Sequence, residues 1–196
     1  MAHIDYFFAT ISPFSYLCGQ RPGEIAAKHG ATITYRPLDI MSLFARTGGT
    51  APKDRHPSRM EYRAQELRRQ TAQTGMPLNP KPAFWPTNPA PSSYAIIAAQ
   101  NEGGDVAGLV HAIGAACWAE EKDISQDDVI RECLTKTGFA ADLADKHMLT
   151  SAETYAANLE DAVANGAFGA PFFITDTDER FWGQDRLDAL DVYLGG

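Results

Sequence analysis

The sequence predicts an α/β fold in which a small sheet is interrupted by a large all-helical insertion. Strand patterns occur only near the two ends of the chain, in residues 4–8, 31–38, 168–175 and 180–183. From residue 39 to about residue 165 the strand signals nearly vanish, and helical patterns follow one another. We therefore expect one domain built from residues 1–40 and 166–196, with residues 41–165 inserted as a helical domain.

The N-terminal part contains two strands joined by a helix. Ile4–Phe8 is an apolar run, and a helical pattern follows over Tyr16–His29, which Gly30 ends. Ala31–Leu38 alternates and is rich in β-branched residues, as in a strand. A strand, a crossover helix and a strand favour parallel pairing.

The insertion begins with a short apolar segment and then a charged helix, Pro57–Thr74. A loop with six prolines follows over residues 77–91, and its length and aromatic residues favour the wall of a pocket. Ser92 or Ser93 is expected to cap the next helix. Helical patterns cover residues 94–101, 106–121, 126–137, 141–148 and 151–165.

At the C-terminal end the strands return as a hairpin. Residues 168–175 form a loop that enters a strand, residues 176–179 are typical of a turn, and residues 180–183 form the second strand. Residues 185–194 are expected to close the fold as a helix.

The composition and net charge of the chain argue against several classes of binding partner. Hydrophobic residues make up 44% and charged residues 21% of the 196 residues, an ordinary globular mixture. The formal net charge of −8 argues against a nucleic acid or an anionic membrane as the main partner. No apolar run approaches the roughly 20 residues that span a bilayer, and no signal peptide is recognisable, so we expect a cytoplasmic protein. The five histidines lack metal-ligand spacing, so no metal is expected.

The three cysteines, Cys18, Cys117 and Cys133, form no Cys-x-x-Cys pair. An odd number without such a pair indicates reduced thiols in a reducing compartment. Cys18 lies close to the serine motif described next, but its apolar neighbours favour a packing role over a nucleophilic one.

The main functional signal is the motif Ser12-Pro13-Phe14-Ser15 between the first strand and its helix. A thioredoxin-type fold places its Cys-x-x-Cys pair there, because a helix N-terminus favours a thiolate. Serine at both ends of the window argues strongly against a disulfide oxidoreductase, and Ser12 is able to donate a hydrogen bond to the thiolate of a small molecule. Alternatively, Ser12 only caps the helix, with Pro13 at its first position.

Three motifs together resemble those of the 2-hydroxychromene-2-carboxylate isomerases. They are S-P-F-S-Y-L at residues 12–17, G-A-P at residues 169–171 and W-G-Q-D-R-L at residues 182–187. That family lies in the DsbA-like branch of the thioredoxin superfamily, next to the kappa-class glutathione transferases. The resemblance runs from Ile4 to about Val192, and it implies a thioredoxin-like fold with a large helical insertion, glutathione as cofactor and a homodimer.

The resemblance also implies a glutathione site. Ser12 matches the serine that activates the glutathione sulfur, Ala170 matches the residue whose backbone pairs with the cysteinyl part, and Pro171 matches a cis-proline. The segment that receives the γ-glutamyl end corresponds to Trp182, Gly183, Gln184 and Asp185. Asp185 is able to pair with the ammonium group, and the adjacent helix N-terminus with the carboxylate. From the residues alone, Trp182 is instead interpreted as a core aromatic.

For the second substrate, the resemblance implies contacts from Asp54, Arg55 and either Phe84 or Trp85. Asn88, in the proline-rich loop, either hydrogen-bonds the ligand or fixes a turn.

One departure from the family concerns Phe44, which stands where relatives carry a lysine. Either a nearby base (Arg46, Lys53 or Arg55) takes the substrate carboxylate, or the substrate differs. Arg55, Arg59 and Arg63 lie on one helical face. They form either a solvated stripe paired with Glu61 and Glu66 or, in part, an anion site.

The predicted function is glutathione-dependent cis–trans isomerisation of 2-hydroxychromene-2-carboxylate or a related carboxylate from aromatic degradation. Two alternatives stay open. In a kappa-like glutathione transferase the thiol remains on the product, whereas a non-catalytic thioredoxin-like module only binds a peptide or partner.

Overall fold

The computed structural model describes all 196 residues and has a four-stranded mixed sheet at its centre. The strand order is β2–β1–β3–β4, with bounds β1 (His3–Phe8), β2 (Thr32–Pro37), β3 (Phe172–Thr175) and β4 (Arg180–Trp182). β1 pairs parallel with β2 and antiparallel with β3, and β3 pairs antiparallel with β4. The predicted parallel pair and the C-terminal hairpin are thus confirmed.

The predicted helix Tyr16–His29 is wrong as a single element. Two helices replace it, α1 (Pro13–Tyr16) and α2 (Arg21–Lys28). Gly19 lies between them with a φ of +58°, a left-handed conformation that breaks a helix and that glycine adopts without steric cost. The macrodipole of a long helix therefore does not point at Ser12.

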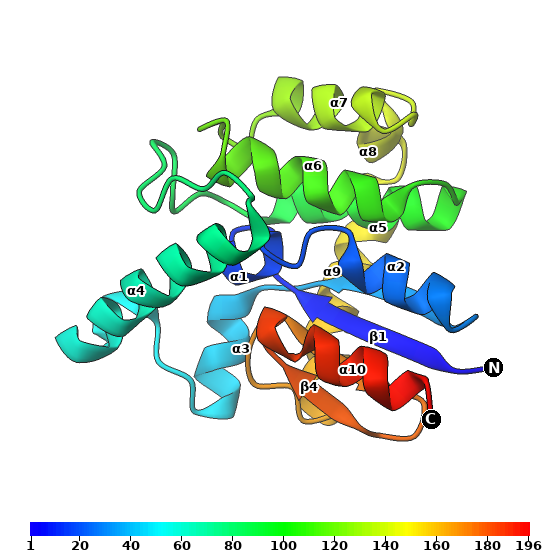
Figure 1. The fold of residues 1–196 in the computed structure, drawn as a ribbon. Helices are drawn as coiled ribbons and strands as arrows, with labels where there is room; N and C mark the ends of the chain where they lie inside the picture. The colour runs from blue at the N-terminus through cyan, green and yellow to red at the C-terminus, as the bar shows by residue number, and fades with distance from the viewer.

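Helices are the only regular secondary structure in the middle of the chain, as predicted. Its elements are α3 (Ile40–Thr47), η1 (Pro52–Asp54), α4 (Pro57–Thr74), α5 (Ala90–Glu102), α6 (Val106–Trp118), α7 (Asp127–Lys136), α8 (Leu143–Lys146) and α9 (Met148–Ala164). In Figure 1, α7 and α8 lie farthest from the sheet, beyond α6, and α4 projects to one side. The bounds of α4 are those predicted from the sequence.

The start of α5 differs from the prediction. Ser92 and Ser93 do not cap it, since the helix already begins at Ala90. Their hydroxyl groups instead donate to the carbonyl of Pro89 at 3.0 and 2.7 Å. The last helix also begins differently, with a 3-10 turn, η2 (Gln184–Arg186), before α10 (Leu187–Leu194).

The two central strands, β1 and β3, are largely buried on both faces of the sheet. On one face, Tyr6 and Phe8 join a cluster that includes residues of α5 and α6, and the Tyr6 ring lies 4.6 Å from that of Phe173. On the other face, Phe7 packs with Ala162 of α9. Burial on both faces explains why β1 is a nearly continuous apolar run. The sheet and the inserted helices therefore share their apolar core.

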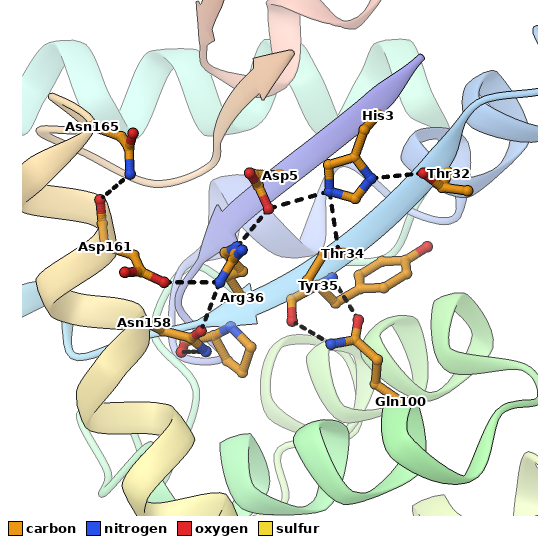
Figure 2. Close-up of polar contacts among 11 residues, drawn as sticks. His3, Asp5, Thr32, Thr34, Tyr35, Arg36, Gln100, Asn158, Asp161 and Asn165 are labelled. Carbon is orange, nitrogen blue, oxygen red and sulfur yellow. Dashed lines mark hydrogen bonds and ion pairs between the residues drawn. The ribbon is translucent and has the colours of Figure 1, made fainter. Parts of the chain in front are cut away.

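Polar contacts add to this attachment of α9. Figure 2 shows Arg36 of β2 between Asp5 of β1 and Asp161 of α9, with nitrogen–oxygen distances of 2.5 and 3.0 Å. Asn158 of α9 donates to the carbonyl of Pro37 at 3.0 Å. These contacts hold α9 against the two N-terminal strands. None of the helices combines the length and hydropathy needed to cross a bilayer.

Candidate active site

The strand pairing brings the three sequence motifs to one edge of the sheet. Phe7, near the end of β1, is paired with Phe172 at the start of β3, and Phe172 is paired with Trp182 at the end of β4. The segments that follow β1, precede β3 and follow β4 therefore meet at this edge. They carry Ser12, Pro171 and Asp185, respectively.

Ser12 is the N-cap of α1. Its Oγ accepts a hydrogen bond from the N–H of Ser15 at 3.3 Å, and Pro13 occupies the first turn of the helix. The side chain is half-buried. Capping uses the hydroxyl as an acceptor, so its own proton remains available for donation. The two sequence interpretations of Ser12 are therefore compatible with each other.

The turn before β3 contains the predicted cis peptide, between Ala170 and Pro171. The backbone N–H and C=O of Ala170 have no hydrogen-bond partner in the chain, whereas the Pro171 carbonyl accepts from Gly183 N–H at 3.0 Å. A Cβ on Gly169 would lie 2.4 Å from Nε1 of Trp182, so glycine is needed for the indole to lie over this turn.

Beyond β4, the chain presents polar groups next to the same turn. Trp182 is 55% exposed, so its interpretation as a core residue is wrong. The N–H groups of Gln184 and Asp185 have no acceptor in the chain, and no side chain caps η2. The Asp185 carboxylate forms an ion pair with Arg186 at 3.2 Å and is otherwise accessible. A ligand that carries both a cationic and an anionic group could pair the first with the Asp185 carboxylate and the second with the free N–H groups.

These groups line a cavity of about 500 Å³, within the range of about 300–1,000 Å³ typical of small-molecule sites. One wall contains the cis-proline turn and the segment from Trp182 to Arg186. The rest of the lining includes the end of α3, Arg55 and residues of α4. Among the predicted site residues, Ala170, Pro171, Trp182, Gly183, Gln184, Asp185 and Arg55 line it.

Other predicted residues lie outside this lining. Ser12 is not part of it, although Phe14, two residues later, is. Asp54 and Phe84 are exposed. Trp85 is half-buried, and its indole N–H donates to the carbonyl of Ile11 at 2.9 Å. Asn88 accepts from the N–H of Ala90 at 3.1 Å, which fixes the start of α5. The ligand contacts of these residues stay predictions.

Phe44, which stands where relatives carry a lysine, stacks against an arginine. The Arg55 guanidinium lies 5.4 Å from the centre of the Phe44 ring, and its Nε donates to the Thr50 carbonyl at 2.8 Å. Arg46 is engaged by Glu160 in a bidentate ion pair. Of the three candidate bases (Arg46, Lys53 and Arg55), only Arg55 is among the residues that line the cavity.

Three aromatic residues of the cavity were not predicted as site residues: Phe14, Tyr62 and Phe168. Phe168 lies just before the Gly-Ala-Pro turn, and its ring packs edge-on against Trp182 at 4.9 Å. Tyr62 lies in a charged helix and is 62% exposed. Phe14 and Phe168 lie in or beside a recognised motif, but the sequence does not distinguish such a site aromatic from core packing, and Tyr62 has no such signal.

No protein thiol is poised for nucleophilic chemistry at this site. All three cysteines are unpaired and buried. Burial raises the pKa of the Cys18 thiol to about 12, and Cys18 donates to the Phe14 carbonyl at 3.5 Å. Cys18 is therefore a protonated packing residue at neutral pH, as expected from its neighbours.

Comparison with known proteins agrees with this architecture. Residues 3–195 match the family described as the DSBA-like thioredoxin domain. The 2-hydroxychromene-2-carboxylate isomerase of Sphingobium xenophagum is 32% identical over 195 residues, which cover 97% of each chain. The chain belongs to this family of DSBA-like thioredoxin proteins. The resemblance inferred from the three motifs is confirmed.

Further relatives and solved structures match nearly the full length of the chain. The 2-hydroxychromene-2-carboxylate isomerase of Pseudomonas putida is 28% identical and covers 98% of this chain and 94% of that protein. A solved 2-hydroxychromene-2-carboxylate isomerase structure superposes with a TM-score of 0.81 at 25% identity, covering 98% of this chain and 94% of that one. The cytosolic disulfide reductase DsbM from Pseudomonas aeruginosa, solved with GSH, shares the fold with a TM-score of 0.72 at 17% identity, covering 98% and 97%.

Proposed function

We propose that this DSBA-like protein is a glutathione-dependent cis–trans isomerase of 2-hydroxychromene-2-carboxylate or a related aromatic carboxylate. The observation that carries the proposal is the meeting of Ser12, the cis-Pro171 turn and Asp185 at one sheet edge, where the protein has no reactive thiol of its own. A site with this arrangement is suited to a thiol that a ligand brings.

The residues present fit glutathione. The free N–H and C=O of Ala170 match the backbone of a peptide laid against the turn, in the manner of an added strand. Asp185 offers a carboxylate for the γ-glutamyl ammonium, and the free N–H groups of Gln184 and Asp185 offer donors for its carboxylate. Trp182 and Phe168 form an apolar wall beside them. Bound glutathione supplies a thiolate that adds reversibly to the conjugated double bond and so permits rotation about it.

Ser12 stabilises the thiolate form of bound glutathione. Its Oγ accepts a hydrogen bond from the Ser15 N–H, and its hydroxyl group donates a hydrogen bond to the glutathione sulfur. A hydrogen bond to a charged group contributes about 1.5–3 kcal/mol, which would lower the pKa of a bound thiol by about 1–2. With a free thiol pKa near 8.5, the thiolate fraction at pH 7 would rise by about 10-fold or more. Because α1 is only four residues long, we assign this effect to the hydroxyl rather than to a helix dipole.

Arg55 binds the substrate carboxylate in this proposal. Its Nε donates to the Thr50 carbonyl, and the face of its guanidinium group stacks on Phe44. The two terminal nitrogens are therefore free to bind a carboxylate in the cavity. The aromatic part of the substrate then contacts Phe44 and Phe14.

Two measurements test the proposal. Turnover of 2-hydroxychromene-2-carboxylate should require glutathione and leave its concentration unchanged, whereas consumption of glutathione in step with product would indicate a transferase. Ser12→Ala should lower kcat about 10- to 100-fold while the affinity for glutathione changes little. Near-normal kcat in this variant would remove Ser12 from the mechanism, and no binding of millimolar glutathione would favour a non-catalytic module.

A further inference from the structure

Arg55 and Arg59 line the cavity, Arg63 lies over Phe14, which also lines it, and none of these three arginines has a carboxylate partner. Arg55 precedes α4, and Arg59 and Arg63 follow at intervals of one helical turn. None of them takes part in an ion pair, although the chain has 25 acidic residues against 17 basic ones. The expected pairing with Glu66 does not form, since Glu66 is bound by Arg69 at 2.6 Å and by Gln70 at 2.9 Å. We call these three residues the arginine triad.

Two members of the triad are held against aromatic rings. Arg55 lies over Phe44, and Arg63 lies 5.8 Å from the centre of the Phe14 ring and 5.9 Å from that of Trp85. Stacking engages the face of a guanidinium group and leaves its N–H edge available. Arg63 has no hydrogen bond to any group of the protein. Its donors are therefore positioned but unused.

The triad concentrates positive charge where the protein does not neutralise it. Burial lowers the pKa of Arg63, and the charge of Arg55 lowers it further. Burial likewise lowers the pKa of Arg55, with a further contribution from Arg59. The cationic states of Arg55 and Arg63 are therefore disfavoured both by burial and by a neighbouring guanidinium group. A bound anion would remove this cost.

We infer that the arginine triad binds a second anionic group, so that among related aromatic carboxylates the cavity prefers a dianion over a monoanion such as 2-hydroxychromene-2-carboxylate itself. One carboxylate lies on Arg55, the second negative group lies on Arg59 and Arg63, and the ring between them contacts Phe44 and Phe14. This inference rests on the proposed function only in taking the cavity as the substrate site. It also explains how the family's lysine is dispensable here, since planar guanidinium groups bind carboxylates in bidentate fashion.

The test compares dianionic with monoanionic probes in the absence of turnover. Titration of the protein with benzene-1,2-dicarboxylate, benzene-1,3-dicarboxylate and benzoate should show at least one dicarboxylate binding about 10-fold or more tightly than benzoate. Arg59→Gln and Arg63→Gln should each remove this preference, and Arg63→Lys should restore part of it. Arg68→Gln is the matched control, since Arg68 is exposed on the same helix and has no ion pair.

Equal affinities for the three probes, or an equal loss in Arg68→Gln, would overturn the inference. Arg59 is exposed, so its variant provides the answer if Arg63→Gln does not fold. Glutathione is titrated into the same samples, which separates the two proposals. If glutathione fails to bind but the dicarboxylate preference holds, the proposed function is refuted and the inference about the arginine triad is supported. If glutathione binds and the preference is absent, only the inference about the triad is refuted.

Discussion

Trp85 provides a sharp test of how the proline-rich loop supports the site. The resemblance predicted a substrate contact for Phe84 or Trp85, whereas the structure gives Trp85 an internal partner, the Ile11 carbonyl at 2.9 Å. Ile11 directly precedes Ser12, so this hydrogen bond fixes the turn that carries the hydroxyl. The ring of Trp85 also lies 5.7 Å from that of Trp118 in the core.

The change Trp85→Phe removes the donor while keeping an aromatic ring. A lost hydrogen bond costs about 0.5–1.5 kcal/mol, and a carbonyl left partly unsatisfied raises the total to about 1–2 kcal/mol. For a chain of this size, that corresponds to a fall in Tm of about 2–8 °C. Because the turn before Ser12 loosens, kcat should fall while the KM for the aromatic substrate changes little.

Urea unfolding of the variant measures the loss of stability, and steady-state kinetics measure the second effect. Phe84→Leu is the control, because Phe84 is the adjacent aromatic and is 52% exposed. Its stability should stay within about 0.5 kcal/mol of the parent. Unchanged stability in Trp85→Phe together with a raised KM would show that Trp85 contacts substrate and does not brace the turn.

Three further predictions concern other parts of the site and its support. Cys18→Ala should retain turnover, and Cys18 should react with a thiol reagent only after unfolding, because burial raises its pKa to about 12; fast labelling of the native protein would contradict this. Hydrogen bonds, the largest from Thr87, lower the pKa of Asp123 to about 2, so the stability that it contributes is present above about pH 4 and is lost as the pH falls towards 2. Asp123→Asn should therefore flatten the acid limb of the stability curve by on the order of 1 kcal/mol after solvent screening, and an unchanged limb in urea titrations would refute the assignment. Gly169→Ala should weaken glutathione binding more than about 10-fold in a direct titration, since the new Cβ displaces Trp182 from the cis-proline turn; unaltered affinity would show that the indole is not part of the site.

Much of the fold was predictable because its signals are local. The apolar run at Ile4–Phe8 and the alternation in Ala31–Leu38 predict β1 and β2, and the bounds of α4 follow from its proline and glycine limits. The break between α1 and α2 was missed, since a single glycine within a helical pattern is often tolerated. Gly19 ends the helix here because its backbone adopts a left-handed conformation, a property that the pattern does not show.

The site was predictable in part for the same reason. The positions of Ala170, Pro171 and Asp185 follow from motifs with a fixed order, and the strand register then brings them together. Whether Arg63 has a carboxylate partner depends on which arginine Glu66 binds, and in the folded protein Glu66 pairs with Arg69. Spacing on a helix places charges on one face but does not assign their partners.

The position of a ligand sulfur tests the central claim most directly. A crystal structure of the protein with glutathione should show the sulfur within about 3.5 Å of Ser12 Oγ and the cysteinyl backbone paired with Ala170. A tripeptide bound with its sulfur beyond reach of that hydroxyl would contradict the account.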